Sequence, residues 1–354
     1  MSAVTIPSRQ GRTPRPARGA TGPEAGMPLA ERLRRAEKDS RSRLQFGPAV
    51  VSLILLGLAA SVLPGYWVSL LSLSLAYSLV ALSLVLLTGY VGQISLAQGS
   101  LLGISAFTTA TLVQLHGLPF GLAMVVAVSV SVGVGLIVGL PALRLQGLAL
   151  AIATWSFALF AERYVLRQPW LTGGQSGRTI RPPRLGGLNF ADDKAMFFLV
   201  AGFCLICLLL VRNLLGGRTG HALVAVRDSE PGAMAMGINV TRYKLLAFAC
   251  SAVIVGVAGA LHAVLVPTLS VNDYNQFVSV TMLAIAMIGG IESLFGAVLA
   301  GLVFIALPQL LKDLGVSLTG SRFDLMVGVA LLLVVVSRPL GLASILPSRR
   351  SASR

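Results

Sequence analysis

The sequence predicts an all-α fold, a polytopic bundle of about 8–10 transmembrane helices. Hydrophobic residues make up 55% of the 354 residues and charged residues only 12%, whereas a soluble domain carries about 25% charge. The mean hydropathy is +0.83. So few charges cannot cover the surface of a soluble protein of this length. The composition therefore excludes a conventional soluble enzyme, a disordered chain and a disulfide scaffold.

Apolar runs long enough to cross a bilayer follow one another along the chain. A helix needs about 20 residues to span the hydrocarbon core. The eighth and tenth runs are short, and the eighth suits a half-helix or a re-entrant segment. The ten candidate spans are residues 46–63, 66–87, 94–113, 122–140, 148–164, 195–211, 245–265, 277–288, 294–311 and 324–336.

The basic residues give the expected orientation. If the N-terminus lies inside, 20 of the 28 Lys and Arg residues fall on the cytoplasmic side, so both termini are expected in the cytoplasm. The Arg-rich segment 1–45 contains no aromatic residue for base stacking, so we expect a disordered tail on anionic lipid rather than a nucleic-acid arm. Residues 46–340 form the transmembrane domain, with a cytoplasmic loop at 212–244 and an external loop at 165–194. Residues 341–354 form a cytoplasmic C-terminal tail.

An uncharged polar and Gly-rich stretch, residues 88–100, lies between two hydrophobic runs. Polar backbone at membrane depth must be screened by protein or must line a cavity. Gln93, Ser95 and Gln98 are able to hydrogen-bond a polar solute there. The stretch also suits interhelical packing through small residues and side-chain hydrogen bonds, so both interpretations stay open.

Other chemistry-bearing residues within the spans are few. Cys204 and Cys207 form a C-x-x-C inside an apolar run without a second Cys or His pair, so we expect buried apolar side chains and no metal site. Glu292 is expected to cap a helix or to pair with a basic residue, and His262 to be a hydrogen-bonded packing residue. The scarcity of carboxylates weakens the case for a proton- or sodium-driven carrier.

The loop 212–244 predicts a short capped helix. Asp228 or Ser229 can be its N-cap, Pro231 is tolerated in a first turn, and Gly237 suits a left-handed C-cap. Such a helix would expose Ala233, Met234 and Met236, a flexible apolar surface suited to docking. The alternative is a surface helix that lies on the protein's own core.

Several blocks in this order resemble the ABC-importer permeases that carry branched-chain amino acids, specifically the LivM-type subunit. They cover about residues 50–340. The loop resembles the family's version of the EAA coupling motif, and the resemblance continues through residues 237–248 and 258–261. The other blocks are residues 88–107 (G-Y-x-G-Q-x-S-L), residues 143–154 (L-R-L-x-G-x-x-L-A-I-A-T), Thr172-Gly173-Gly174 and Gly289-Gly290.

The resemblance implies an ABC-importer permease that passes branched-chain amino acids across a bacterial inner membrane. Related permeases import urea, amides or aromatic acids, and a secondary solute carrier remains an alternative of another class. The implied ATPase-coupling residues are Arg227, Asp228, Ser229, Glu230, Ala233, Met234, Met236 and Gly237. The candidate translocation path comprises Gly92, Gln93, Ser95, Gln98 and Thr154, and the external loop contributes Thr172, Gly173 and Gly174.

The chain lacks a G-x-x-x-x-G-K-[ST] phosphate-binding loop, so we expect no enzymatic activity and no bound cofactor. ATP and Mg²⁺ would be bound by a separate ATPase. The implied partners are a LivH-type sister permease, one or two ATPase subunits, an external solute-binding protein and membrane lipid, but no nucleic acid. The sequence departs from the family at Gly232 and Met234, where Ala and Glu are more usual, and at Glu292, where Gly is usual.

Overall fold

The structure is a computed structural model that describes residues 46–174, 177–180, 184–185, 188–189 and 192–313. Within these ranges the predicted all-α class is confirmed. A short antiparallel hairpin, β1 (Arg184–Leu185) and β2 (Leu188–Asn189), lies in the predicted external loop. The predicted tails and the tenth candidate span, residues 324–336, lie outside the described residues.

Each of the first nine candidate spans overlaps a helix. From α2 to α7 the elements are α2 (Phe46–Val62), α3 (Gly65–Leu84), π-helix η1 (Val85–Tyr90), α4 (Gln98–His116), α5 (Phe120–Ala142), α6 (Leu148–Phe160), π-helix η2 (Ala161–Val165) and α7 (Pro169–Thr172). The later elements are α8 (Asp193–Gly216), α9 (Arg218–Asp228), α10 (Glu230–Ala235), α11 (Val240–Leu265), 3-10 helix η4 (Val271–Tyr274), α12 (Gln276–Gly289) and α13 (Leu294–Asp313).

Five helices of the described part are long and apolar enough to cross a membrane, namely α3 with η1, α5, α6 with η2, α8 and α11. α2, α12 and the first part of α13 are apolar but shorter. α4 has 19 residues but is less apolar, because it carries Gln98, Ser105 and Thr109 among other polar side chains. These side chains are buried, so neighbouring helices screen them from lipid.

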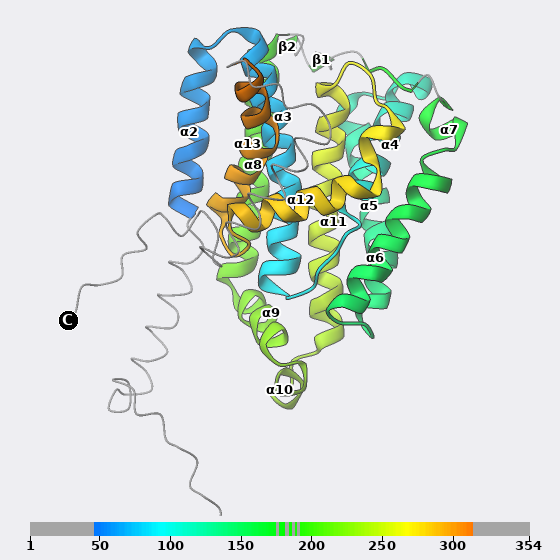
Figure 1. Cartoon of the computed structure of the whole chain (residues 1–354), viewed down its shortest axis with the longest axis vertical. Coiled ribbons are helices and arrows are strands. Elements are labelled where there is room, and N and C mark those ends of the chain that lie inside the picture. Colours follow the sequence, from blue (N-terminus) through cyan, green and yellow to red (C-terminus); the bar gives the residue numbers. More distant parts are fainter. Residues whose placement is uncertain (1–45, 175–176, 181–183, 186–187, 190–191, 314–354) are drawn as a thin grey trace, which may run out of the picture. The chain divides into compact units, whose positions relative to one another are not determined.

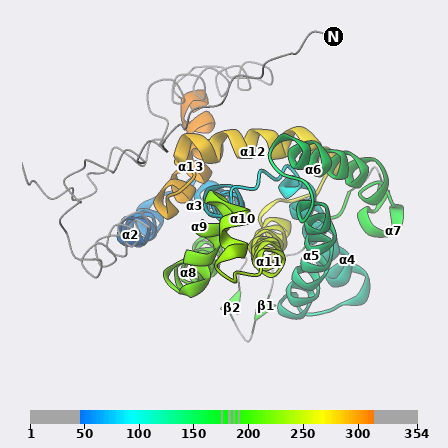
Figure 2. The same cartoon turned by 90° about the horizontal axis from the view of Figure 1, so that it is seen from below.

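α3 and α11 form the centre of the described bundle. Among the most apolar 18 residues of each helix, 83% are buried in α3 with η1 and 78% in α11, compared with 33% in α5 and 39% in α8. α11 packs against α5, α4 and α3, whereas α3 also packs against α13 and α8. Figure 2 shows α3 and α11 with α8 on one side and α5 on the other. The exposed apolar faces of α5 and α8 therefore suit lipid or another membrane subunit.

The short helix α12 runs in a different direction from the long helices. Figures 1 and 2 show it crossing the bundle instead of running alongside α3 and α11, and it contacts α3, α4, α6 and α13. With 14 residues it extends about 21 Å, too short for a bilayer core. The half-helix or re-entrant interpretation of this segment is therefore the one that matches the structure.

Candidate functional site

The polar stretch forms an irregular segment inside the bundle. α3 ends in η1, and residues 91–97, here called the unwound stretch, have no regular helix before α4 begins at Gln98. The third candidate span, residues 94–113, overlaps α4, which begins four residues later. Gly92, with a positive φ of 72°, lies in the unwound stretch before it. The Gln93 backbone N–H donates to the Leu87 carbonyl at 3.0 Å, which closes the wide turn of η1.

Hydrogen bonds from other helices hold the unwound stretch and the start of α4. The Leu96 N–H donates to Thr154 Oγ1 at 2.9 Å, and the Gly99 N–H donates to Ser279 Oγ at 2.9 Å. Gln98 Nε2 donates to Ser251 Oγ at 3.2 Å. Thr154, a candidate residue of the translocation path, therefore lies beside the unwound stretch. Ser251 and Ser279 were not predicted, because serines in apolar helices carry no sign of their tertiary partner.

Two amide oxygens of this segment remain without a hydrogen-bond donor. Gln93 and Gln98 are 4% and 1% exposed, and neither Gln93 Oε1 nor Gln98 Oε1 has a partner within the described part of the chain. A buried acceptor left unpaired costs about 1–3 kcal/mol. The segment therefore retains two acceptors that N–H groups of a polar solute are able to satisfy.

The predicted short helix is present as α10, with the predicted caps. Ser229 Oγ accepts a hydrogen bond from the Gly232 N–H at 3.1 Å, so Ser229 rather than Asp228 is the N-cap. Gly237 has a φ of 79°. Bonds from the Ile238 N–H to the Ala233 carbonyl and from the Gly237 N–H to the Met234 carbonyl, both 3.0 Å, complete a Schellman C-cap.

One face of α10 is exposed and the other lies on the protein. Met234 and Met236 are 57% and 69% exposed, as predicted for a docking surface. The expected exposure of Ala233 was wrong, since this residue is fully buried where α10 packs against α9 and α11. Figure 1 shows α10 at one end of the bundle, at the opposite end from α7.

A buried lysine joins α10 to the core. Lys244 lies in the first turns of α11 with 1% of its side chain exposed, and its Nζ is 2.5 Å from Glu230 Oε1. The same Nζ donates to the Ala142 carbonyl at 3.1 Å, at the end of α5. Gln93 Nε2 donates to this carbonyl as well, at 3.5 Å. The sequence did not reveal this role of Lys244, because its partners lie in two other segments, α10 and the end of α5.

Arg227 forms a second link at the end of α9. Its Nη1 is 2.7 Å from Glu292 Oε1 and donates to the Gly89 carbonyl at 2.5 Å. The expectation that Glu292 pairs with a basic residue is confirmed, and Ser293 caps α13 in its place, accepting from the Gly296 N–H at 3.1 Å. Partial burial alone would lower the pKa of Arg227, but the hydrogen bonds and charges of Glu292 and Asp228 raise the pKa above its ordinary value. Arg227 is therefore cationic at every physiological pH.

The external residues lie at the α7 end of the bundle, so the structure does not bring them together with α10. Gly173 ends α7 with a φ of 75°, and the Gly174 N–H donates to Thr172 Oγ1 at 3.3 Å. Arg178, which was not singled out, is 7% exposed and orders this loop. It donates through Nε to the Leu171 carbonyl at 2.9 Å and through Nη1 to Gln114 Oε1 at 3.1 Å.

The remaining candidates are structural. His262 is hydrogen-bonded through its two ring nitrogens to Tyr274 at 2.8 Å and Tyr77 at 3.3 Å, as expected for a packing histidine. Cys204 and Cys207 are free and buried. Among the described residues no group of His, Cys, Asp and Glu is arranged to hold a metal.

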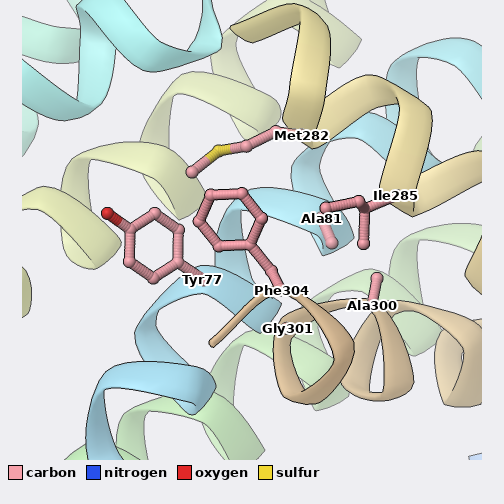
Figure 3. Close-up of a pocket in the computed structure, with 7 residues that line it drawn as sticks. All are labelled: Tyr77, Ala81, Met282, Ile285, Ala300, Gly301 and Phe304. Atoms are coloured by element: carbon pink, nitrogen blue, oxygen red, sulfur yellow. The ribbon is translucent and has the colours of Figure 1, made fainter. Parts of the chain in front are cut away.

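A small, partly open hollow, with room for about one water molecule, lies between α3, α12 and α13. Figure 3 shows Met282, Ile285 and Phe304 around it, with the Tyr77 hydroxyl pointing away from these side chains. The lining is completed by Ala81, Ala300 and Gly301. A hollow lined almost wholly by apolar groups does not suit a polar solute, so the unwound stretch is the better candidate for the path.

Comparison with known proteins identifies the family. Residues 66–336 match the family described as branched-chain amino acid transport system / permease component. The chain is 30% identical over 299 residues to the high-affinity branched-chain amino acid transport system permease protein LivM of Salmonella typhimurium, covering 78% of this chain and 69% of the relative. Its identity to LivM of Escherichia coli is 29% over the same shares.

A sugar permease is also related. The fructose import permease protein FrcC of Rhizobium meliloti is 26% identical over 316 residues, covering 82% of this chain and 85% of the relative. No solved structure matches the chain. The family match spans most of the described bundle and agrees with the motifs found along it, so the chain is a multi-pass membrane protein that belongs to the family of branched-chain amino acid transport system permease components.

Proposed function

We propose that this chain is the membrane-spanning permease subunit of an ATP-driven importer and that it passes branched-chain amino acids into the cell. The observation that carries the proposal is α10, a capped helix at one end of the bundle with Met234 and Met236 exposed. The family match and the two LivM relatives support it independently.

α10 is the docking site for a cytoplasmic ATPase in this proposal. The ATPase binds ATP and Mg²⁺, and its movement displaces the segment from Arg227 to Gly237 and changes which side of the membrane the path faces. The α10 end of the bundle is then cytoplasmic, and both termini lie inside. A LivH-type sister permease completes the path, and an external solute-binding protein docks at the α7 end, where Thr172–Gly174 lie.

The substrate follows from the relatives and from the unwound stretch. The LivM relatives are 29–30% identical, compared with 26% for the fructose permease. The unpartnered oxygens of Gln93 and Gln98 suit the ammonium group of an amino acid, which only donates hydrogen bonds. Permeases for urea, amides or aromatic acids share the family resemblance, and these solutes are the competitors that a transport assay needs.

Reconstitution tests the proposal. We expect proteoliposomes with this chain, its sister permease, the ATPase and the binding protein to accumulate labelled leucine only when ATP is hydrolysed. Excess isoleucine should compete with leucine, and excess urea or acetamide should not. Leucine uptake by this chain alone, driven by a sodium or proton gradient without any ATPase, would instead establish a secondary carrier.

A further inference from the structure

We propose that Lys244 and Arg227 are positioning residues that connect α10 to the unwound stretch, so that displacement of α10 changes the conformation of this polar segment. The inference rests on the proposed function, since it takes α10 as the place where the ATPase acts. It is argued from two ion pairs, Lys244 with Glu230 and Arg227 with Glu292, whose cations are connected to the segment around the unwound stretch through separate contacts.

The first connection runs through Lys244. Its Nζ lies 2.5 Å from Glu230 Oε1 in α10 and 3.1 Å from the Ala142 carbonyl at the end of α5. With 1% of its side chain exposed, Lys244 has no access to water that would replace Glu230. A buried ammonium group separated from its carboxylate is strongly destabilised. Movement of Glu230 must therefore carry Lys244 with it or break the pair at high cost.

This connection ends on the candidate path. The Ala142 carbonyl accepts from Lys244 Nζ at 3.1 Å and from Gln93 Nε2 at 3.5 Å. If Lys244 shifts, the Ala142 carbonyl loses one of these two donors, and its hydrogen bond with the Gln93 amide changes with it. The other end of the same amide, Oε1, has no donor among the described residues, so no hydrogen bond from them opposes rotation of Gln93 there.

The second connection runs through Arg227, which lies in α9 immediately before α10. Its Nη1 donates to the Gly89 carbonyl at the end of η1. The alkyl part of the side chain covers Gly92, where an added Cβ would lie 2.7 Å from Arg227 Cγ. Glu292, between α12 and α13, holds the guanidinium in place at 2.7 Å.

The two connections converge on residues 89–93, where the chain leaves helical geometry. A regular helix transmits displacement as a rigid body, whereas the unwound stretch is able to change shape without breaking a continuous ladder of helical hydrogen bonds. Another helix holds its backbone through Thr154 Oγ1, which accepts from the Leu96 N–H. Displacement of α10 therefore reaches the polar stretch through side-chain contacts rather than by tilting a whole helix.

Measuring leucine uptake per ATP hydrolysed in the complete reconstituted complex tests this inference. We expect Glu230→Gln to lower the leucine uptake per ATP hydrolysed by about five-fold or more. Lys244→Arg keeps the cation and should lose less than Lys244→Met. Glu292→Gln should have a smaller effect than Glu230→Gln, because Arg227 still donates to Gly89.

Asp192→Asn and Arg242→Gln, at exposed positions outside both connections, are the matched controls.

A second measurement does not depend on the transported solute. In a background with the three native cysteines replaced by alanine, Ser95→Cys reports on the unwound stretch through its rate of reaction with a maleimide. We expect this rate to change about five-fold or more when ATP and vanadate are added, and Glu230→Gln to abolish the change.

The outcomes separate the two proposals. Equal losses of hydrolysis and uptake in Glu230→Gln, or a nucleotide-dependent labelling change that survives Glu230→Gln, would overturn the connection through Lys244. A Ser95→Cys complex that retains Glu230, shows the nucleotide-dependent labelling change and yet does not accumulate leucine would contradict the proposed substrate and leave the connection supported.

Discussion

Gln98 combines one hydrogen bond and one unpaired acceptor in a single buried amide. Its Nε2 donates to Ser251, whereas its Oε1 lacks a donor among the described residues. Folding alone does not favour this arrangement, because an unpaired buried oxygen costs about as much as one hydrogen bond contributes. Under the proposed function, Gln98 Oε1 is an acceptor for the solute, and this role is open to a direct test.

Replacing Gln98 with leucine separates these roles. We expect Gln98→Leu to change the stability of the purified complex by less than about 1 kcal/mol, since it removes a hydrogen bond and an unpaired acceptor together. Leucine uptake should fall markedly. Thermal unfolding in detergent and uptake in proteoliposomes measure the two effects.

Ser131→Ala is the control for this substitution. Ser131 Oγ is also buried and has no hydrogen-bond partner within the described part of the chain, but it lies in α5, away from the unwound stretch in the sequence. This variant should retain uptake. Normal uptake by Gln98→Leu would remove Gln98 from the path.

At the scale of elements, α5 and α11 approach closely through small residues. A Cβ added at Gly135 would lie 2.5 Å from Ala252 Cβ, and one at Gly256 would lie 3.1 Å from Val128 Cα. Close approach of this kind stabilises helix pairs in a membrane, where the hydrophobic effect does not favour one helix contact over lipid. The interface therefore fixes the position of α11, and with it that of Lys244.

A larger residue at this interface should separate the helices. We expect Gly135→Val to destabilise the purified complex by about 1–3 kcal/mol through overpacking. Gly133→Ala, two residues away with no neighbour within 4 Å of the added methyl group, should be neutral or slightly stabilising. Thermal unfolding of both variants measures the difference, and equal midpoints would show that the α5–α11 contact is not tight.

Sequence patterns predicted the elements better than their contacts. Hydropathy located the helices because each must bury about 20 apolar residues in lipid. Capping rules located α10 because Ser229 and Gly237 act on their own neighbours. The exposure of Ala233 was wrong because it depends on the packing of α10 against α9 and α11, which local patterns do not specify.

The candidate site shows the same limit. Gln93 and Gln98 were recognisable as polar residues in an apolar setting, and Glu292 as a charge that needs a partner. The pairing of Glu292 with Arg227, and of Lys244 with both Glu230 and Ala142, joins residues far apart in the chain. Nothing in one sequence specifies such long-range partners.

At the scale of the whole molecule, the proposed function places the ATPase at the α10 end of the bundle and the entry of the solute at the α7 end. Trp170, 68% exposed, lies in α7, and Met236, 69% exposed, follows α10. Figure 1 shows these two elements at opposite ends of the bundle. The two positions therefore report on the two sides of the membrane.

Cysteine labelling at these positions tests the orientation. In a cysteine-free background, Trp170→Cys should react with a membrane-impermeant maleimide in intact spheroplasts. Met236→Cys should react only after permeabilisation. The reverse pattern would place α10 outside and make its contact with a cytoplasmic ATPase impossible.

The most direct measurement is a photo-crosslink from α10 to the ATPase in the assembled complex. Met236 is the C-cap of α10 and contributes its backbone N–H there, so a photoreactive side chain at this position leaves the cap hydrogen bonds in place. The account predicts a crosslink to the ATPase from position 236 and none from position 170. An ATPase that co-purifies in full yield without any crosslink from position 236 would contradict it.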